Sequence, residues 1–129
     1  MAERSRDWFR QAEHDLAHAR NAERAGDHDW ACFAAQQAAE KALKALASRM
    51  GGEAWGHSLL AMVGDLRAAD AEIDSLRERA IRLDRLYVPT RYPSGFDAGA
   101  PVDYFLAADA GAAIEDAEAV IEFVRRRLS

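Results

Sequence analysis

The sequence predicts an all-α fold, an antiparallel bundle of four helices with one additional short helix, and three observations carry that prediction. The chain of 129 residues contains only three prolines and eight glycines, so few positions interrupt a helix. Alanine is abundant, and alanine has the highest helix propensity. Apolar residues recur every three to four positions, the period of a helix with one buried face. We expect one domain over residues 1–129.

The first two helices are long and are separated by a glycine. The first covers residues 6 to about 24, and its apolar stripe comprises Trp8, Ala12, Leu16 and Ala19. Gly26 ends it, and Asp27 or Asp29 caps the second helix, which runs from residue 30 to about 49. The apolar side of the second helix is formed by Ala35, Ala38, Ala39, Ala42, Leu43, Leu46 and Met50.

Polar side chains of the second helix fall on a single stripe. They are Gln36, Gln37, Glu40, Lys41 and Lys44, with the aromatic residues Trp30 and Phe33 nearer the helix start. Two interpretations remain open. The stripe is a solvated face on which Glu40 and Lys44 form an i,i+4 pair, or it is a partly buried surface such as a subunit contact or a pocket wall.

Three further helices are predicted in the second half of the chain. A short helix begins after His57 and Ser58 and buries Leu59, Leu60, Val63 and Leu66. The next begins at a capping box of Ser75 and Glu78 and stops before Pro89, because the residue before a proline avoids the α region. The last covers about residues 103–127, with a buried stripe of Leu106, Ala110, Ala113, Ile114, Ala117, Ile121, Val124 and Leu128.

Charge and cysteine content limit the function classes. The net charge of −5 argues against a protein that coats DNA, but it allows a local basic patch in a cleft. The single cysteine, Cys32, cannot form an intramolecular disulfide and fits a small core residue. We find no secretory signal and no apolar run long enough to cross a membrane. We therefore expect a cytoplasmic protein without a membrane partner.

The segment "RLYVPTRYPSGFDAGAP", residues 85–101, differs from the rest of the chain because it is rich in helix breakers and in tyrosine and arginine. Pro89 and Pro93 restrict the backbone, so we expect Arg91 and Tyr92 on a stiff, extended strut aimed at a phosphate or a carboxylate. The alternative is that Arg91 pairs internally with an acid such as Asp84 or Asp15 and anchors the loop.

Four stretches carry a resemblance to a known family: "WFRQAEHDLAHA" (8–19), "FAAQQAAEKALKAL" (33–46), "HSLLAMVGDL" (57–66) and "RLDRLYVPTRYP" (82–93). In this order they resemble the HEPN family, small helical domains of prokaryotes often encoded beside minimal nucleotidyltransferases. The resemblance implies an antiparallel bundle that commonly forms homodimers and a connection to nucleotides or RNA. It also implies a toxin-antitoxin-like, two-gene module.

Many members of that family are metal-independent ribonucleases whose site is an arginine and a histidine with four to six residues between them. Arg91 fits the arginine, but residues 96–98 contain no histidine, and none follows His57 in the chain. Arginine binds a phosphate but cannot act as a base near neutral pH. Whether the protein is an enzyme therefore stays open at the level of sequence.

The predicted binding residues combine this resemblance with the local chemistry. We expect a phosphate to contact Lys41, Lys44, Arg82, Tyr87, Arg91 and Tyr92, with support from His57, Asp84 and Gln37. We expect no cofactor and no metal, because "HDLAH" (14–18) lacks the glutamate of zinc proteases and a third ligand. Three hypotheses remain: a nucleotide- or RNA-binding partner of a minimal nucleotidyltransferase, a ribonuclease with an altered site, and a structural adaptor without a ligand.

Overall fold

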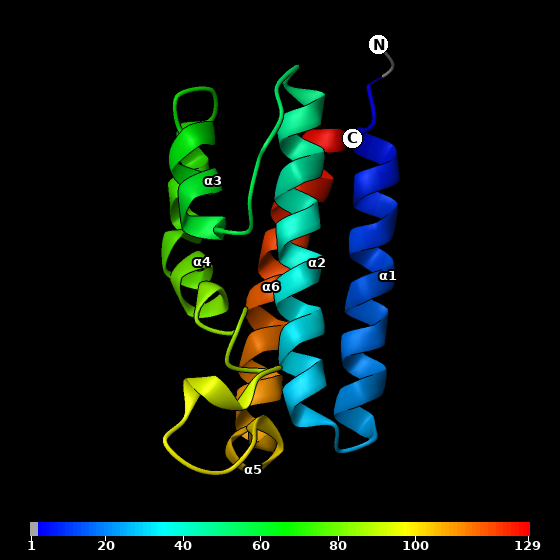
Figure 1. Cartoon of the computed structure of the whole chain (residues 1–129). Coiled ribbons are helices and arrows are strands. Elements are labelled where there is room, and N and C mark those ends of the chain that lie inside the picture. Colours follow the sequence, from blue (N-terminus) through cyan, green and yellow to red (C-terminus); the bar gives the residue numbers. More distant parts are fainter. Residues whose placement is uncertain (1–2) are drawn as a thin grey trace.

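The computed structural model describes residues 3–129 and confirms the all-helical prediction, with no strand in that part of the chain (Figure 1). The elements in order are α1 (Ser5–Arg24), α2 (His28–Arg49), α3 (Leu59–Leu66), η1 (Ala71–Leu76), α4 (Arg77–Asp84), η2 (Pro93–Gly95), α5 (Pro101–Tyr104) and α6 (Ala107–Leu128), where η marks a 3-10 helix.

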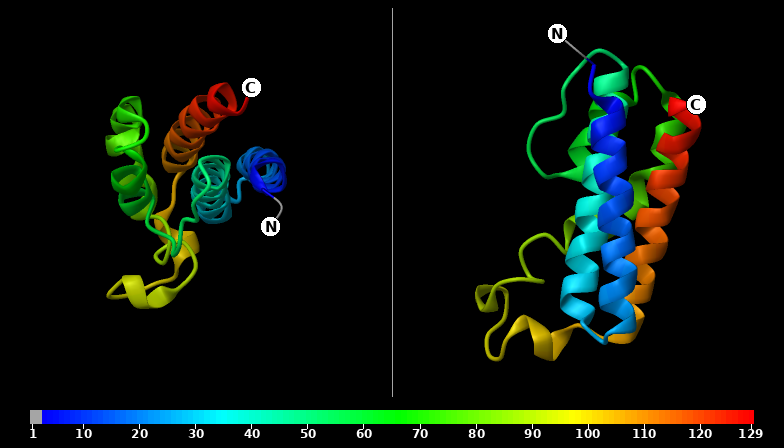
Figure 2. Two further views of the ribbon diagram at one scale, coloured as in Figure 1. Left: turned by 90° about the horizontal axis from the view of Figure 1, so that it is seen from above. Right: turned by 90° about the vertical axis from the view of Figure 1, so that its right-hand side faces the viewer.

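The three long helices form the centre of the bundle. α2 lies between α1 and α6 and packs against both, while α3 and α4 form a shorter pair on the side away from α1 (Figure 1). The start of α1 and the end of α6 lie at the same end of the bundle, and the views in Figure 2 place the connecting segment 85–106 at the opposite end. This segment contains η2 and α5, and α5 contacts α2. The beginning of α2 and the connecting segment therefore meet at one end of the molecule.

Small residues explain how closely α2 can approach its neighbours. All the alanines of α2 are buried together with Cys32, and the larger buried side chains Leu43 and Leu46 fill the space between the helices.

Gly26 follows α1 with φ of 78°, a left-handed conformation that favours glycine, so the predicted stop signal is confirmed.

The fourth helix begins and ends differently from the prediction. Ser75 lies inside η1, and α4 starts at Arg77 without a side-chain cap, so the predicted capping box is wrong. α4 ends at Asp84 rather than at Pro89, and residues 85–91 continue as turns. Thr90 Oγ1 donates to the carbonyl of Leu86 over 2.6 Å, and Arg91 N donates to the carbonyl of Val88 over 3.0 Å. The predicted extended strut is thus a series of hydrogen-bonded turns, and only Tyr92 is extended.

The last predicted helix is divided in two. Asp103 accepts a hydrogen bond from Ala100 N, and Asp109 accepts one from Leu106 N, so each aspartate caps the start of a separate helix. Leu106 stands before α6 and is exposed, which corrects its assignment to the buried stripe. Trp8 and Met50 are also exposed rather than buried, because they lie near the helix ends at the margin of the core.

None of the described helices is long and apolar enough to span a membrane.

Candidate anion-binding site around Arg91

The polar stripe of α2 is largely buried, which decides between the two interpretations of it. Gln36 is 0% exposed and Glu40 is 3% exposed. The Glu40 carboxylate lies 3.3 Å from Lys44 Nζ, 3.4 Å from Gln36 Nε2 and 3.0 Å from His57 Nδ1. These partners compensate the cost of removing the carboxylate from water. The Glu40–Lys44 pair is confirmed, but it belongs to a partly buried surface and not to a solvated face.

His57 connects this buried carboxylate to the connecting segment. Its ring stacks on Tyr87, with 4.6 Å between ring centroids and 19° between planes. Because a carboxylate accepts hydrogen bonds, the Nδ1 atom of a neutral His57 donates to Glu40 and the Nε2 atom keeps its lone pair. The His57 side chain is 54% exposed, so this second nitrogen belongs to a solvent-accessible ring.

Arg91 is held by rings and by a backbone carbonyl. Its Nε and Nη2 atoms donate to the carbonyl oxygen of Tyr87 over 3.0 and 2.6 Å. Its Cζ atom lies 4.2 Å from the ring centroid of Phe33, 4.7 Å from that of Tyr87 and 5.0 Å from that of Tyr92. Cation–π contacts of this kind fix the plane of the guanidinium without neutralising its charge.

The charge of Arg91 has no carboxylate partner among residues 3–129. Five lysine and arginine side chains in this range are partly buried, and four of them form ion pairs. The ion pairs are Lys41 with Asp15, Lys44 with Glu40, Arg79 with Asp116, and Arg127 with Asp70 and Glu72. The interpretation that Arg91 pairs with Asp84 or Asp15 is wrong, because Asp84 caps α3 and Asp15 binds Lys41. Arg91 is the exception.

The structure brings together only part of the predicted set. Contacts join Arg91, Tyr87, Tyr92 and His57, and Lys44 reaches His57 through their common partner Glu40. Gln37 donates to Gln36 over 2.8 Å and so borders the same cluster. Other predicted residues have different partners: Arg82 Nε donates to Asp116 over 2.8 Å, and Asp84 accepts from the backbone nitrogens of Leu59 and Leu60.

Two members of the cluster, Phe33 and Glu40, were not predicted as site residues. The helical wheel places both on the polar stripe of the second helix, and this position is the sequence feature that indicates them. Their partners at positions 57 and 87 depend on how the loops fold back, which spacing along one helix does not show.

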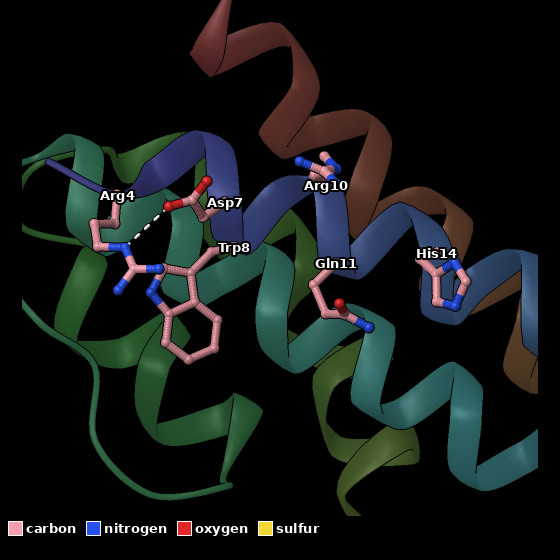
Figure 3. A pocket seen from close by; sticks show the side chains of 6 residues that line it. All are labelled: Arg4, Asp7, Trp8, Arg10, Gln11 and His14. Atoms are coloured by element: carbon pink, nitrogen blue, oxygen red, sulfur yellow. Dashed lines mark hydrogen bonds and ion pairs between the residues drawn. The ribbon is translucent and has the colours of Figure 1, made fainter.

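A surface hollow lies elsewhere, along the first half of α1. It measures about 660 Å³ and is lined by Arg4, Asp7, Trp8, Arg10, Gln11 and His14 (Figure 3). Arg4 and Asp7 already form an exposed ion pair across 2.9 Å. Among the residues that the structure covers, no group of three histidine, cysteine, aspartate or glutamate side chains is placed to hold a metal ion, and this includes the "HDLAH" stretch.

A long three-helix core, a shorter helix pair and a tyrosine- and arginine-bearing segment across the end of α2 describe a helical bundle of the HEPN class. The HEPN domain matches residues 5–127, so the chain belongs to the HEPN family.

Solved structures agree with this assignment. The chain is 44% identical to TT1696 of Thermus thermophilus, with a TM-score of 0.92, covering 97% of this chain and 98% of that one. It is 36% identical to the archaeal HEPN homologue ST0689, with a TM-score of 0.83 and coverage of 99% and 100%. A HEPN domain protein of Thermotoga maritima is 33% identical, with a TM-score of 0.77 and coverage of 95% and 97%. A comparison with curated protein sequences gave no match.

Proposed function

We propose that this HEPN protein binds the phosphate of a nucleotide or RNA at Arg91 and works, as a cytoplasmic homodimer, with a minimal nucleotidyltransferase in a toxin-antitoxin-like, two-gene module. One observation carries the binding role: a partly buried guanidinium without a carboxylate partner in residues 3–129. Charged side chains that are removed from water are normally paired, so a partly buried one without a counter-charge is a candidate for binding an anion.

The remaining donors of Arg91 suit a phosphate. A guanidinium has five N–H groups, and the Tyr87 carbonyl takes one from Nε and one from Nη2. The other N–H of Nη2 and both of Nη1 donate to no acceptor within residues 3–129. Neighbouring N–H groups on one edge of a guanidinium match two phosphate oxygens. The rings of Phe33 and Tyr87 also contact the guanidinium, so a ligand binds through these remaining N–H groups.

A purely structural role explains less of this geometry. Arg91 does brace the connecting segment, because it joins the Tyr87 carbonyl to the Phe33 ring of α2. A brace of this kind requires contact area and two donors, but it gives no reason to keep a charge without a counter-charge. These contacts therefore orient the guanidinium, and its remaining N–H groups bind the phosphate.

Calorimetric titration with adenosine 5'-monophosphate (AMP) tests the binding role. We expect wild type to bind and Arg91→Met to lose binding by about 30-fold, since hydrogen bonds to charged groups contribute roughly 2 kcal/mol. Arg127→Met is the matched control, because Arg127 also stacks on a phenylalanine but is already ion-paired. Equal affinities of wild type and Arg91→Met would contradict the proposal.

The partnership with a nucleotidyltransferase is supported by the family assignment and by the four sequence stretches that resemble HEPN proteins. The polar stripe of α2 offers such a partner little free surface, because Gln36 and Glu40 are buried. Co-expression with the minimal nucleotidyltransferase of the same genome, followed by size-exclusion chromatography, tests this part. Separate elution of the two proteins at micromolar concentration would contradict it.

The Glu40–His57 pair favours a second candidate function, that of a metal-independent ribonuclease. In this case His57 Nε2 takes the proton of a ribose 2'-hydroxyl, the 2'-oxygen attacks the phosphorus, and the 5'-oxygen of the next nucleotide leaves and is protonated from solvent. Arg91 stabilises the charge on the phosphorane oxygens. The products are a 2',3'-cyclic phosphate and a 5'-hydroxyl. Cleavage of a structured RNA in metal-free buffer by wild type, lost in both His57→Asn and Arg91→Met, would establish it, and no cleavage by wild type would remove it.

A further inference from the structure

A second hollow lies at the end of the bundle where α1 begins, opposite to the connecting segment that carries Arg91. It measures about 540 Å³, which is within the size range of small-molecule sites. The start of α1, the end of α2 and the α2–α3 connection form its walls. Its charged and aromatic lining residues are Glu3, Arg4, Trp8, Lys44, Glu53 and Trp55. Phosphate binding at Arg91 gives this hollow no role.

Two tryptophans give the hollow its aromatic surface. The Lys44 ammonium lies 5.5 Å from the centroid of the Trp8 ring, so one ring of this hollow already holds a cation. Trp55 is 83% exposed, and within residues 3–129 its ring neither stacks on an aromatic side chain nor carries a cation. Trp55 therefore offers a free ring face at the hollow.

The charges around the hollow leave one carboxylate without a partner. Three of the four charged lining residues form ion pairs, namely Glu3 with Arg49 at 3.5 Å, Arg4 with Asp7 at 2.9 Å and Lys44 with Glu40 at 3.3 Å. The fourth, Glu53, is exposed and forms no ion pair or hydrogen bond with any other residue in the range 3–129. The uncompensated charge of the hollow is therefore negative and favours a cationic ligand over an anionic one.

From this arrangement we propose that the hollow binds a small organic cation of the alkylammonium class, held over the Trp55 ring and attracted by the Glu53 carboxylate. Tryptophan attracts cations more strongly than the other aromatic side chains do, and aromatic rings are a common means of recognising quaternary ammonium groups. The proposal goes beyond phosphate binding and does not depend on it, because the two sites lie at opposite ends of the bundle.

Choline and 3,3-dimethyl-1-butanol test the role of the charge, because the two molecules have the same shape and only choline is positively charged. Nuclear magnetic resonance of the indole N–H groups follows both titrations, and the chain has three tryptophans. We expect choline to shift the signals of Trp8 and Trp55 saturably and to leave that of Trp30, at the other end of the bundle, in place. We expect the alcohol to bind about tenfold more weakly, since it keeps the apolar contact but loses the attraction to ring and carboxylate.

Two substitutions of exposed side chains locate the ligand. Trp55→Leu should weaken choline binding about fivefold, because it removes the free ring. Glu53→Gln should weaken it about threefold, because an exposed charge pair contributes little. The matched controls are Trp30→Leu and Glu78→Gln, which remove the same groups elsewhere, Glu78 being exposed on α4. Both controls should bind choline as wild type does.

Three results would overturn the inference. Equal affinities for choline and the alcohol would show an apolar crevice without cation recognition. The absence of a saturable shift at Trp8 and Trp55, or wild-type choline affinity in Trp55→Leu, would exclude the site itself. None of these results bears on phosphate binding at Arg91, which the AMP titration measures separately.

Discussion

Arg91 and Arg127 occupy similar surroundings but hold their charges differently. Each is partly buried, and each guanidinium carbon lies 4.2 Å from the ring centroid of a phenylalanine, Phe33 for Arg91 and Phe123 for Arg127. Arg127, however, donates to Asp70 and Glu72, whereas Arg91 donates to the Tyr87 carbonyl. Arg127 joins α6 to the segment before α4, where the carboxylates of Asp70 and Glu72 compensate its charge. Arg91 lies at the opposite end of the bundle and has no counter-charge among residues 3–129.

The difference shows that stacking on an aromatic ring does not by itself decide what an arginine does. Whether a carboxylate pairs with its charge decides whether it can bind an anion. An arginine that is paired with carboxylates has its charge already compensated, so it attracts an anion less and contributes to the fold. An arginine oriented by rings and by one carbonyl has a fixed plane and a free edge.

Introducing a carboxylate beside Arg91 should make it resemble Arg127. Tyr92→Glu places an acid on the residue next to the guanidinium, and the internal ion pair should lower the affinity for ribose 5-phosphate by about 30-fold. Tyr92→Gln has the same shape without the charge and should leave this affinity within about threefold of wild type. Calorimetry on both variants measures the difference, and equal losses would show that the free charge is not what binds.

Replacing the guanidinium by an ammonium should have an intermediate effect. Arg91→Lys keeps the positive charge but loses the planar fork that bonds both the Tyr87 carbonyl and a phosphate. We expect affinity for AMP to fall about tenfold in the same titration. Wild-type affinity in this variant would mean that charge alone is sufficient and that the geometry of the guanidinium is not used.

Removing the supporting ring should have a smaller effect on binding. Phe33→Leu deletes a cation–π contact that contributes about 0.5–1 kcal/mol, so affinity for ribose 5-phosphate should fall about two- to fivefold. Phe123→Leu removes the equally placed ring under Arg127 and should not change that affinity. A loss of the same size in both variants would point to general loosening of the bundle.

The paired arginine should be visible in acid stability. The hydrogen bond from Arg127 holds the pKa of Asp70 below its ordinary value. A carboxyl group with a lowered pKa stabilises the folded state above its unfolded pKa, about 3.9, and this stabilisation is lost as the pH falls through the folded pKa. Chemical denaturation between about pH 6 and pH 2 should therefore show a steeper loss below about pH 4 for wild type than for Asp70→Asn. Arg91→Met should follow wild type, and a flattened profile for it would reveal a carboxylate partner.

The sequence predicts the helices well because their signals are local. Apolar periodicity and Gly26 are sufficient to place the first two helices close to their observed ends. The errors fall where two local signals compete. A helix from 103 onwards was a reasonable interpretation of the apolar pattern, but Asp103 and Asp109 each cap a separate start. The Ser75–Glu78 pair was a valid capping motif that η1 overrides.

The site was predicted in part, for a related reason. Arg91 and Tyr87 lie four residues apart, and their contact follows from the short segment that contains them. The roles of Lys41 and Arg82 depended on which acids the folded chain brings to them, Asp15 from α1 and Asp116 from α6. Such long-range pairs cannot be derived from the spacing of one segment, and they decide which cation stays free.

Nuclear magnetic resonance of the arginine Nε–Hε groups observes each guanidinium separately and therefore shows which of them an anion contacts. The signals of Arg91 and Arg127 can be assigned from the Arg91→Lys and Arg127→Lys variants and followed while AMP is added. We expect the Arg91 signal to shift progressively with ligand concentration and the Arg127 signal to stay in place. A stationary Arg91 signal at millimolar AMP would contradict the assignment of this arginine as the anion-binding group.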